Sequence, residues 1–235
     1  MELQSSGPSI PKMKIGTRLR VLYHLRRFAR PSGNDYRHLE RVRQLLRQNG
    51  WFAHSLAHTA KFEENARALR ERWLFDDLNT QVDAMASFPK ETLGRAYSDF
   101  LKLNALDAQF FRPLPAETDE GYYIVRALQT HDLWHVVLDR TTSSDDEIFI
   151  QAIMFAQLRW PTSGFLIVGY LWEVLLKNPT YLGTALTVVT DGWRMGHELP
   201  PLFGVHWEEL WHLPLEEVRS RLGIPKRTLQ SSNLH

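Results

Sequence analysis

Apolar residues recur every three or four positions along most of the chain, and this spacing predicts helices rather than strands. The pattern is clearest where leucines alternate with arginines, over 15–29 and again over 35–48. Runs of alternating polar and apolar residues, which would indicate strands, are scarce. Further helices are expected over 52–78 (one or two), 92–103, 121–140, 144–160, 164–177 and 181–195, with short ones over 207–211 and 215–222. The pattern therefore predicts an all-α fold, a multi-helix bundle.

Polar and proline-containing segments separate these helices. Residues 31–34 read Pro-Ser-Gly-Asn, and Pro113 and Pro115 mark a connector. The segment Thr141-Thr142-Ser143 is a short polar turn, so the helices on either side of it should form a helical hairpin.

The composition sets the size of the fold. A chain of 235 residues, 43% of them apolar, supports one sizeable core. We therefore expect a single helical domain over 13–225, between flexible tails at 1–12 and 226–235. The chain has no cysteine, which excludes disulfides, thiolate metal ligands and cysteine nucleophiles. Its function must use histidine, carboxylate, hydroxyl or arginine groups.

Charge is distributed unevenly along the chain. Residues 1–50 hold eleven Lys and Arg against three Asp and Glu, whereas the rest holds seventeen against twenty-four. The basic helices within 13–50 predict binding to an anionic membrane surface, a nucleic acid or an acidic partner chain, although a merely solvated arm is an equal alternative. Nucleic acid is the least favoured partner, because the chain contains no recognisable nucleic-acid-binding motif.

Large apolar side chains are concentrated in 148–189. The helix over 164–177 is apolar nearly all round and is expected to be buried, with Glu173 needing a partner there. The longest uncharged stretches have thirteen residues, too few to cross a bilayer, so we expect a soluble or peripheral protein. Most of these side chains should form ordinary core, but helices this apolar could also wall a channel for a lipid tail.

Two imidazoles and two carboxylates lie close together in the sequence at His131, Asp132, His135 and Glu147. On a helix His131 and His135 share one face, and a tight hairpin would return Glu147 to the same place. This mixed donor set suits zinc, iron or manganese better than calcium, and magnesium is less natural. The spacing therefore predicts a divalent metal site on the hairpin.

Simpler explanations exist for each of these groups. Ser144 and Glu147 have the spacing of a capping box, in which the glutamate would only cap its own helix. Asp132 could be a first-turn acid if a new helix began at Thr130, and the two histidines could satisfy each other through water. Spacing alone leaves these alternatives open.

The His-Asp-x-x-His, eleven residues, Glu pattern resembles the hallmark of the coenzyme Q biosynthesis protein 4 family. The segment 88–97, Phe-Pro-Lys-Glu-Thr-Leu-Gly-Arg-Ala-Tyr, is similar to that family's upstream segment, and 192–196 with 201–211 and 214–219 is similar to its carboxy-terminal signature. The resemblance covers roughly 85–224. The chain departs from the family pattern at 196–200, where relatives more often carry basic residues.

The resemblance implies a helical protein that binds a polyprenyl aromatic lipid or prenyl phosphate in an apolar channel. It implies metal-dependent removal of the ring C1 carboxylate of a polyprenyl 4-hydroxybenzoate derivative, with C1 hydroxylation in some descriptions. The alternative role is a non-catalytic scaffold for other quinone-biosynthesis proteins, and a homodimer is compatible with either. His131, Asp132, His135 and Glu147 are the ligands carried over. Because no convincing transit peptide is present, we expect a cytoplasmic, peripheral membrane protein of bacterial rather than mitochondrial type.

Overall fold

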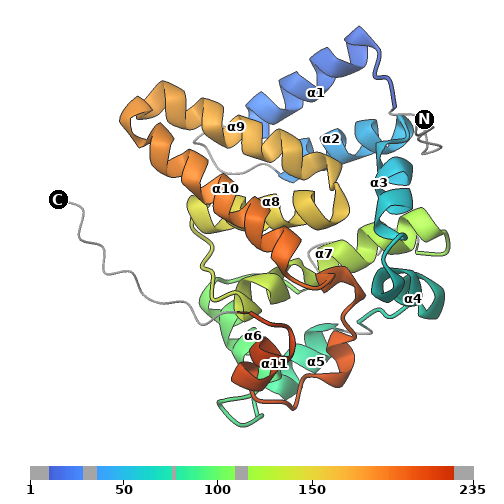
Figure 1. Ribbon diagram of the computed structural model, residues 1–235, viewed down its shortest axis with the longest axis vertical. Coiled ribbons are helices and arrows are strands. Elements are labelled where there is room, and N and C mark those ends of the chain that lie inside the picture. The colour runs from blue at the N-terminus through green and yellow to red at the C-terminus, as the bar shows by residue number, and fades with distance from the viewer. Residues whose placement is uncertain (1–10, 29–35, 76–77, 109–115, 225–235) are drawn as a thin grey trace, which may run out of the picture.

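The computed structural model describes residues 11–28, 36–75, 78–108 and 116–224, and every regular element in these ranges is a helix (Figure 1). The helices are α1 (Ile15–Phe28), α2 (Tyr36–Gln48), α3 (Trp51–Thr59), α4 (Glu63–Glu71), α5 (Leu78–Met85), α6 (Leu93–Leu103), α7 (Asp119–Val137), α8 (Ser144–Leu158), α9 (Pro161–Lys177), α10 (Leu182–Glu198) and α11 (Leu215–Arg221). Short 3₁₀ turns occupy Pro179–Tyr181, Leu202–Gly204 and Trp207–Glu209. The predicted all-α, single-domain fold is confirmed.

Most predicted helices begin and end within a few residues of the observed ones. The stretch 52–78 divides into α3 and α4, and α5 was not predicted. The expected helix over 207–211 is only a 3₁₀ turn. The predicted break at 31–34, the prolines at 113 and 115, and most of the two tails lie outside the described residues.

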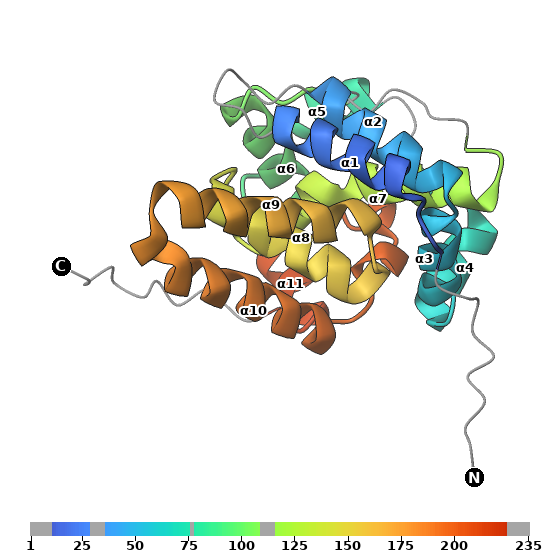
Figure 2. The ribbon, with the colours of Figure 1, turned by 90° about the horizontal axis from the view of Figure 1, so that it is seen from above.

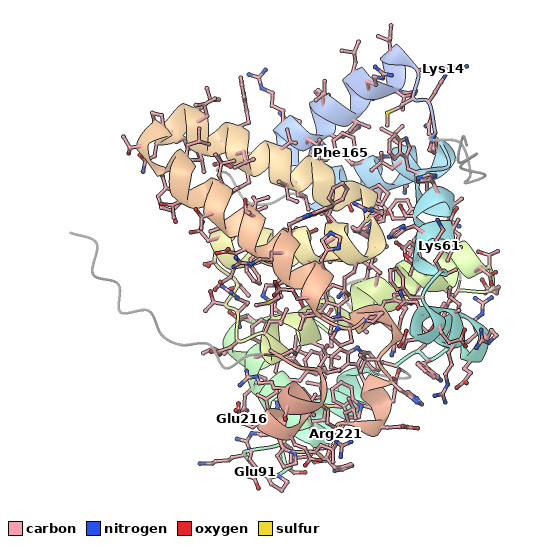
Figure 3. All side chains as sticks on the ribbon, in the orientation of Figure 1. Lys14, Lys61, Glu91, Phe165, Glu216 and Arg221 are labelled. Atoms are coloured by element: carbon pink, nitrogen blue, oxygen red, sulfur yellow. The ribbon has the colours of Figure 1, made fainter. Side chains whose placement is uncertain are left out.

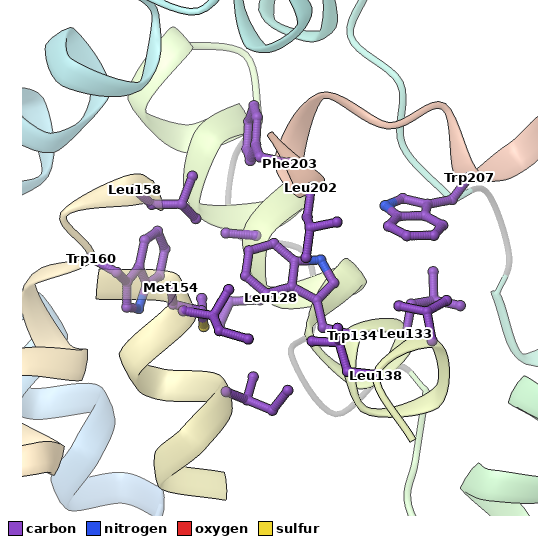
Figure 4. Close-up of a cluster of buried hydrophobic side chains, with 14 of the residues drawn as sticks. Leu128, Leu133, Trp134, Leu138, Met154, Leu158, Trp160, Leu202, Phe203 and Trp207 are labelled. Atoms are coloured by element: carbon purple, nitrogen blue, oxygen red, sulfur yellow. The ribbon is translucent and has the colours of Figure 1, made fainter. Parts of the chain in front are cut away.

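The core is built around α7, whose residues are buried on nearly every side. Its aromatic and aliphatic side chains meet α8 and the segment that follows α10 (Figure 4). The labelled members of this cluster are Leu128, Leu133, Trp134, Leu138, Met154, Leu158, Trp160, Leu202, Phe203 and Trp207. The packing around α7 therefore restricts the movement of the polar side chains on this helix.

A buried ion pair fixes the segment after α10 against α7. The guanidinium of Arg126 is fully buried and donates to both carboxylate oxygens of Glu208, at 2.5 and 3.1 Å. It also donates to the carbonyl of Val205 at 2.8 Å. Because an unpaired buried charge is costly, this fork ties the 3₁₀ turns of the carboxy-terminal part to the centre of the molecule.

Two glycines allow α10 to lie directly against α8. A Cβ atom at Gly192 would come within 2.5 Å of the Phe149 carbonyl oxygen, and one at Gly196 within 2.7 Å of the Ala156 Cβ. The Gly-x-x-x-Gly spacing therefore has a steric cause: both positions face the backbone of α8. Figure 2 shows α8 between α9 and α10, with α1 and α2 beside α9.

The expected burial of the helix over 164–177 is wrong. Val168, Trp172 and Leu176 of α9 are 66%, 61% and 66% exposed. Glu173 is also at the surface, where it pairs with Lys177 on the next turn. The helix packs on α8 and α10, and α1 and α2 touch it only in part, so several of its apolar residues stay exposed. None of the described helices is both long and apolar enough to span a membrane.

The contact between α8 and α10 should be intolerant of a single added methyl group. We expect Gly192→Ala to lower the free energy of unfolding by about 2 kcal/mol, because the helices must move apart. Gly183→Ala is the matched control on the same helix, since a Cβ atom there meets nothing within 4 Å. Urea unfolding of both variants makes the comparison, and equal stabilities would contradict the packing described here.

Candidate metal centre

The turn between α7 and α8 is held by a buried carboxylate. Asp146 accepts hydrogen bonds from the backbone N–H and the hydroxyl of Thr141, at 2.9 and 2.7 Å, and from Arg140 at 3.1 Å. Burial alone would raise the pKa of Asp146, but these hydrogen bonds and the Arg140 charge outweigh it and hold the pKa below its usual value. Ser143 caps α8 by accepting from the Asp146 N–H at 3.3 Å. Hydrogen bonds among residues 140–146 thus fix the geometry of the hairpin.

This hairpin brings three of the four predicted ligands together. Nε2 of His131 lies 3.4 Å from one carboxylate oxygen of Glu147, and Nε2 of His135 lies 3.2 Å from the other. One donor atom from each of the three residues falls within 4.8 Å of the others. The spacing argument from the sequence therefore placed His131, His135 and Glu147 correctly beside one another.

Asp132 lies at the edge of this cluster. Its carboxylate is 3.3 Å from Nδ1 of His131, on the opposite edge of the imidazole from Glu147. Neighbouring positions on a helix point in different directions, so Asp132 does not converge on the same point. The structure favours a role for Asp132 in orienting His131, and its role as a direct ligand stays a prediction.

Two of the simpler explanations, the capping box and a helix start at Thr130, do not match the geometry. The cap of α8 is Ser143 and not Ser144, and the Glu147 carboxylate faces the histidines. No helix begins at Thr130, because α7 is continuous through it. Nδ1 of His135 donates to the Thr141 carbonyl at 2.9 Å rather than to His131. Glu147 and the two histidines therefore contact one another, and Nδ1 of His135 makes the hydrogen bond that fixes its ring.

The partners of the cluster set the direction of its donor atoms. Because Nδ1 of His135 carries the hydrogen bond to Thr141, its Nε2 is the ring nitrogen that faces Glu147 and is left to bind a metal ion. The His135 ring is 1% exposed and stacks on Phe100, with ring centroids 5.7 Å apart. A metal ligand generally needs such support, since a freely rotating imidazole binds weakly.

Two further supporting residues escape sequence reasoning. The side-chain amide of Gln151 donates to Glu147 at 2.8 Å and lies 3.3 Å from Nε2 of His131. The buried hydroxyl of Ser163 donates to the side-chain oxygen (Oε1) of Gln151 at 2.6 Å. Gln151 stands one helical turn after Glu147, which could have indicated it, whereas nothing in the sequence links Ser163 to the site.

The charges of the cluster are strongly coupled. Burial alone would lower the pKa of His131, but the Glu147 charge and the hydrogen bonds to Asp132 and Glu147 raise it to about 10. Burial would likewise raise the pKa of Glu147, but His131 and His135 bring it well below its usual value. A metal ion would have to replace the proton of His131, so its binding should strengthen as pH rises.

The donor set fits a transition metal or zinc. Two imidazoles and one carboxylate are the mixed nitrogen and oxygen ligands that zinc, iron and manganese accept, and three protein donors leave coordination positions for another molecule. A cleft of about 640 Å³ between α6, the end of α7 and α11 reaches His135 and is lined also by Phe100, Leu103, Arg140 and Leu215. His135 thus lies at the wall of this cleft, although its side chain is almost fully buried.

Fold and site together define a class: an all-α protein with a candidate mononuclear metal centre on a helical hairpin. The model of the family described as "Coenzyme Q (ubiquinone) biosynthesis protein Coq4" matches residues 52–228, most of the chain. The chain therefore belongs to the Coq4 family, and the resemblance found in its motifs is confirmed. The match begins after α2, so the two basic helices lie outside it.

Individual relatives support this assignment. The mitochondrial ubiquinone biosynthesis protein COQ4 homolog of Mus musculus is 26% identical over 202 residues, which cover 81% of this chain and 72% of the relative. The mitochondrial COQ4 of Mycosarcoma maydis is 23% identical over 76% of this chain, which spans only 57% of that relative's length. The crystal structure of a "putative ubiquinone biosynthesis protein" from Nostoc punctiforme is 27% identical with a TM-score of 0.77, covering 88% of this chain and 96% of its own.

Metal titration should distinguish a ligand from a supporting residue. We expect Glu147→Gln to abolish measurable zinc binding, because it removes the carboxylate that faces both imidazoles. Asp132→Asn should weaken binding by only about 10- to 100-fold, the usual effect of losing a group that orients a ligand. Competition with a chromogenic chelator at fixed pH gives both affinities. Equal losses in the two variants would make Asp132 a direct ligand.

Proposed function

We propose that this protein is a metal-dependent decarboxylase of ubiquinone or prenylquinone biosynthesis, acting at ring C1 of a polyprenyl 4-hydroxybenzoate derivative. Membership of the Coq4 family supports the pathway. The observation that carries the catalytic proposal is the convergence of His131, His135 and Glu147, next to a cleft that His135 lines. Three donors with room for another molecule are typical of catalytic rather than purely structural metal sites.

The chain supplies the framework for a bound metal ion. His131, His135 and Glu147 would hold it, and zinc is the best match, with iron, manganese or magnesium as alternatives. When bound, the ion supplies a Lewis acid that stabilises negative charge developing on the substrate. Thr141 and Asp132 hold the protons of the two imidazoles on Nδ1, which leaves both Nε2 atoms for binding. Gln151 and Ser163 keep the Glu147 carboxylate in place.

The reaction itself exchanges a carboxylate for a proton. The bond from ring C1 to the carboxylate carbon breaks, carbon dioxide leaves, and a proton takes its place at C1. An oxidative version would need dioxygen and a two-electron reductant as co-reactants, and would place a hydroxyl at C1 with release of water. Both versions develop negative charge on the aromatic head group, which a positively charged centre stabilises.

Apolar residues lie next to the cluster, where a prenyl tail could bind. Immediately after Glu147, α8 presents Ile148 and Ala152, which pack with Ile167 of α9 as a second, smaller core. Partly buried residues of α9 and α10 border this core: Phe155, Leu166, Tyr170, Leu171, Val188 and Val189. We propose that the tail lies along this seam between α8, α9 and α10, with its aromatic head at Glu147.

Decarboxylation by the purified, zinc-loaded protein tests the proposal. We expect release of carbon dioxide from a carboxyl-labelled prenylated 4-hydroxybenzoate, reduced at least about 100-fold in Glu147→Gln. Glu173→Gln is the matched control, because that carboxylate is on the surface of α9 and pairs only with Lys177. If the wild-type protein bound zinc and lipid but released no more carbon dioxide than Glu147→Gln, the protein would be a lipid-binding scaffold and not an enzyme.

We also propose that α1 attaches the protein peripherally to an anionic membrane. Ile15, Leu19, Leu22 and Tyr23 are 74%, 62%, 58% and 58% exposed, and their spacing places them on one stripe of the helix. Arg18, Arg20, Arg26 and Arg27 belong to the same helix. Exposed apolar groups flanked by arginines are typical of helices that lie in the surface of an anionic bilayer.

Vesicle sedimentation tests this attachment. We expect the full chain to bind vesicles containing anionic lipid at low salt, with binding weakened by Leu19→Gln combined with Leu22→Gln. Leu103→Gln is the control, because this leucine of α6 is 86% exposed but is not part of the stripe. High salt should also weaken binding, since the arginines contribute through screened charge. Salt-independent binding that survives both substitutions would remove α1 from the attachment.

A further inference from the structure

A second group of titratable side chains lies at the opposite end of α8 from the metal centre. Glu147 stands near the start of α8 and Arg159 caps its end, about 18 Å away along the helix. At this end α8 meets α3, because the Ser55 hydroxyl donates to the Arg159 carbonyl at 2.8 Å. It also meets the end of α10, because the Gln157 amide donates to the Pro200 carbonyl at 3.0 Å.

Each of these three helices brings basic groups to the meeting point. His54 and His58 are one turn apart on α3, and Lys61 follows that helix. Trp193 of α10 is close to both Arg159 of α8 and His197 of α10. The Arg159 guanidinium lies 5.2 Å from the centroid of the Trp193 ring, and the centroids of the His197 and Trp193 rings are 4.8 Å apart. The charges of Arg159, Lys61, His54 and His197 all act on His58, in that order of strength.

These basic groups have no acidic partner among the described residues. Glu63 and Glu198 are close to them in the sequence, but they pair with Arg70 and Arg194 instead. In addition, Nδ1 of His54 is buried and makes no hydrogen bond to any described group. Unpaired cations and an unsatisfied buried nitrogen are the features expected of a site that receives an anion.

Helix ends alone would not balance these charges. Each carboxy-terminal helix end carries roughly half a negative charge, so the ends of α3, α8 and α10 together supply about −1.5. Lys61 and Arg159 already exceed this amount with two full positive charges, before any of the three histidines is protonated. The surplus grows as protons are added, which favours a ligand with more than one negative charge.

We propose that His54, His58, Lys61, Arg159 and His197 form a second binding site, for a phosphate group. A phosphate monoester carries about −1.5 to −2 charges at neutral pH and three acceptor oxygens, which matches several cations better than a single carboxylate does. The planar guanidinium of Arg159 and the exposed ammonium of Lys61 provide several N–H donors for its oxygens. The ligand is a free phosphate compound or the head group of a phospholipid.

Histidine NMR on the full chain tests the site with inorganic phosphate as the probe. We expect phosphate to shift the imidazole resonances of His54, His58 and His197 and to raise the pKa of His58, which burial and the neighbouring cations hold below its usual value. Binding should therefore tighten as the pH falls through and below about 6.5, where the His58 imidazole gains a proton. Chloride at equal ionic strength should produce no such shift, and an equal response to chloride would overturn the proposal.

Variants identify the groups and distinguish the two sources of phosphate. Arg159→Gln and His58→Gln should each weaken phosphate binding about tenfold, whereas Arg221→Gln should not. Arg221 is a suitable control because it lies on α11, far from Lys61 (Figure 3). A second arm measures binding to phosphatidic acid vesicles: sensitivity there to Arg159→Gln indicates a lipid head group, and its absence indicates a free phosphate compound. If Arg159→Gln changed neither assay while remaining folded, the site would be refuted.

Discussion

The turn between α7 and α8 determines how His131, His135 and Glu147 are placed relative to one another. Asp146 is buried and satisfies the backbone and hydroxyl of Thr141, and Thr141 in turn fixes the ring of His135. Without that carboxylate, the backbone N–H and hydroxyl of Thr141 and the guanidinium of Arg140 would lose the hydrogen bonds that shape the turn. The first turn of α8 would then lose its position relative to α7, and with it the contact of Glu147 with both histidines. A structural aspartate thus precedes the functional glutamate by one residue.

Helix α8 connects this centre to most of the other features of the fold. Gly192 and Gly196 let α10 approach its backbone, and α9 covers another of its faces. Glu147 belongs to its first turn, whereas Arg159 at its end meets α3 and α10. A displacement of α8 would therefore disturb the metal centre, the apolar seam and the basic cluster at once. This dependence gives a physical reason for glycine at the two closest contacts.

The sequence predicted those parts of the molecule that depend on local spacing. His131 and His135 must share a helix face, and a short turn must return Glu147, so the meeting of these three side chains followed from local spacing. Properties that depend on neighbouring elements were not accessible in this way. The apolar character of α9 did not indicate which face would be covered, and Ser163 reaches the site only because α9 folds back along α8. Asp132 seemed equivalent to the other ligands until its direction was known.

The central claim is that His131, His135 and Glu147 bind one metal ion. The most direct test is X-ray diffraction from crystals of the full chain grown with zinc, with data collected on both sides of the zinc absorption edge. The account predicts one anomalous peak at about 2.0–2.2 Å from Nε2 of both histidines and an oxygen of Glu147. No peak at this position, or a peak only at surface histidines elsewhere, would contradict it.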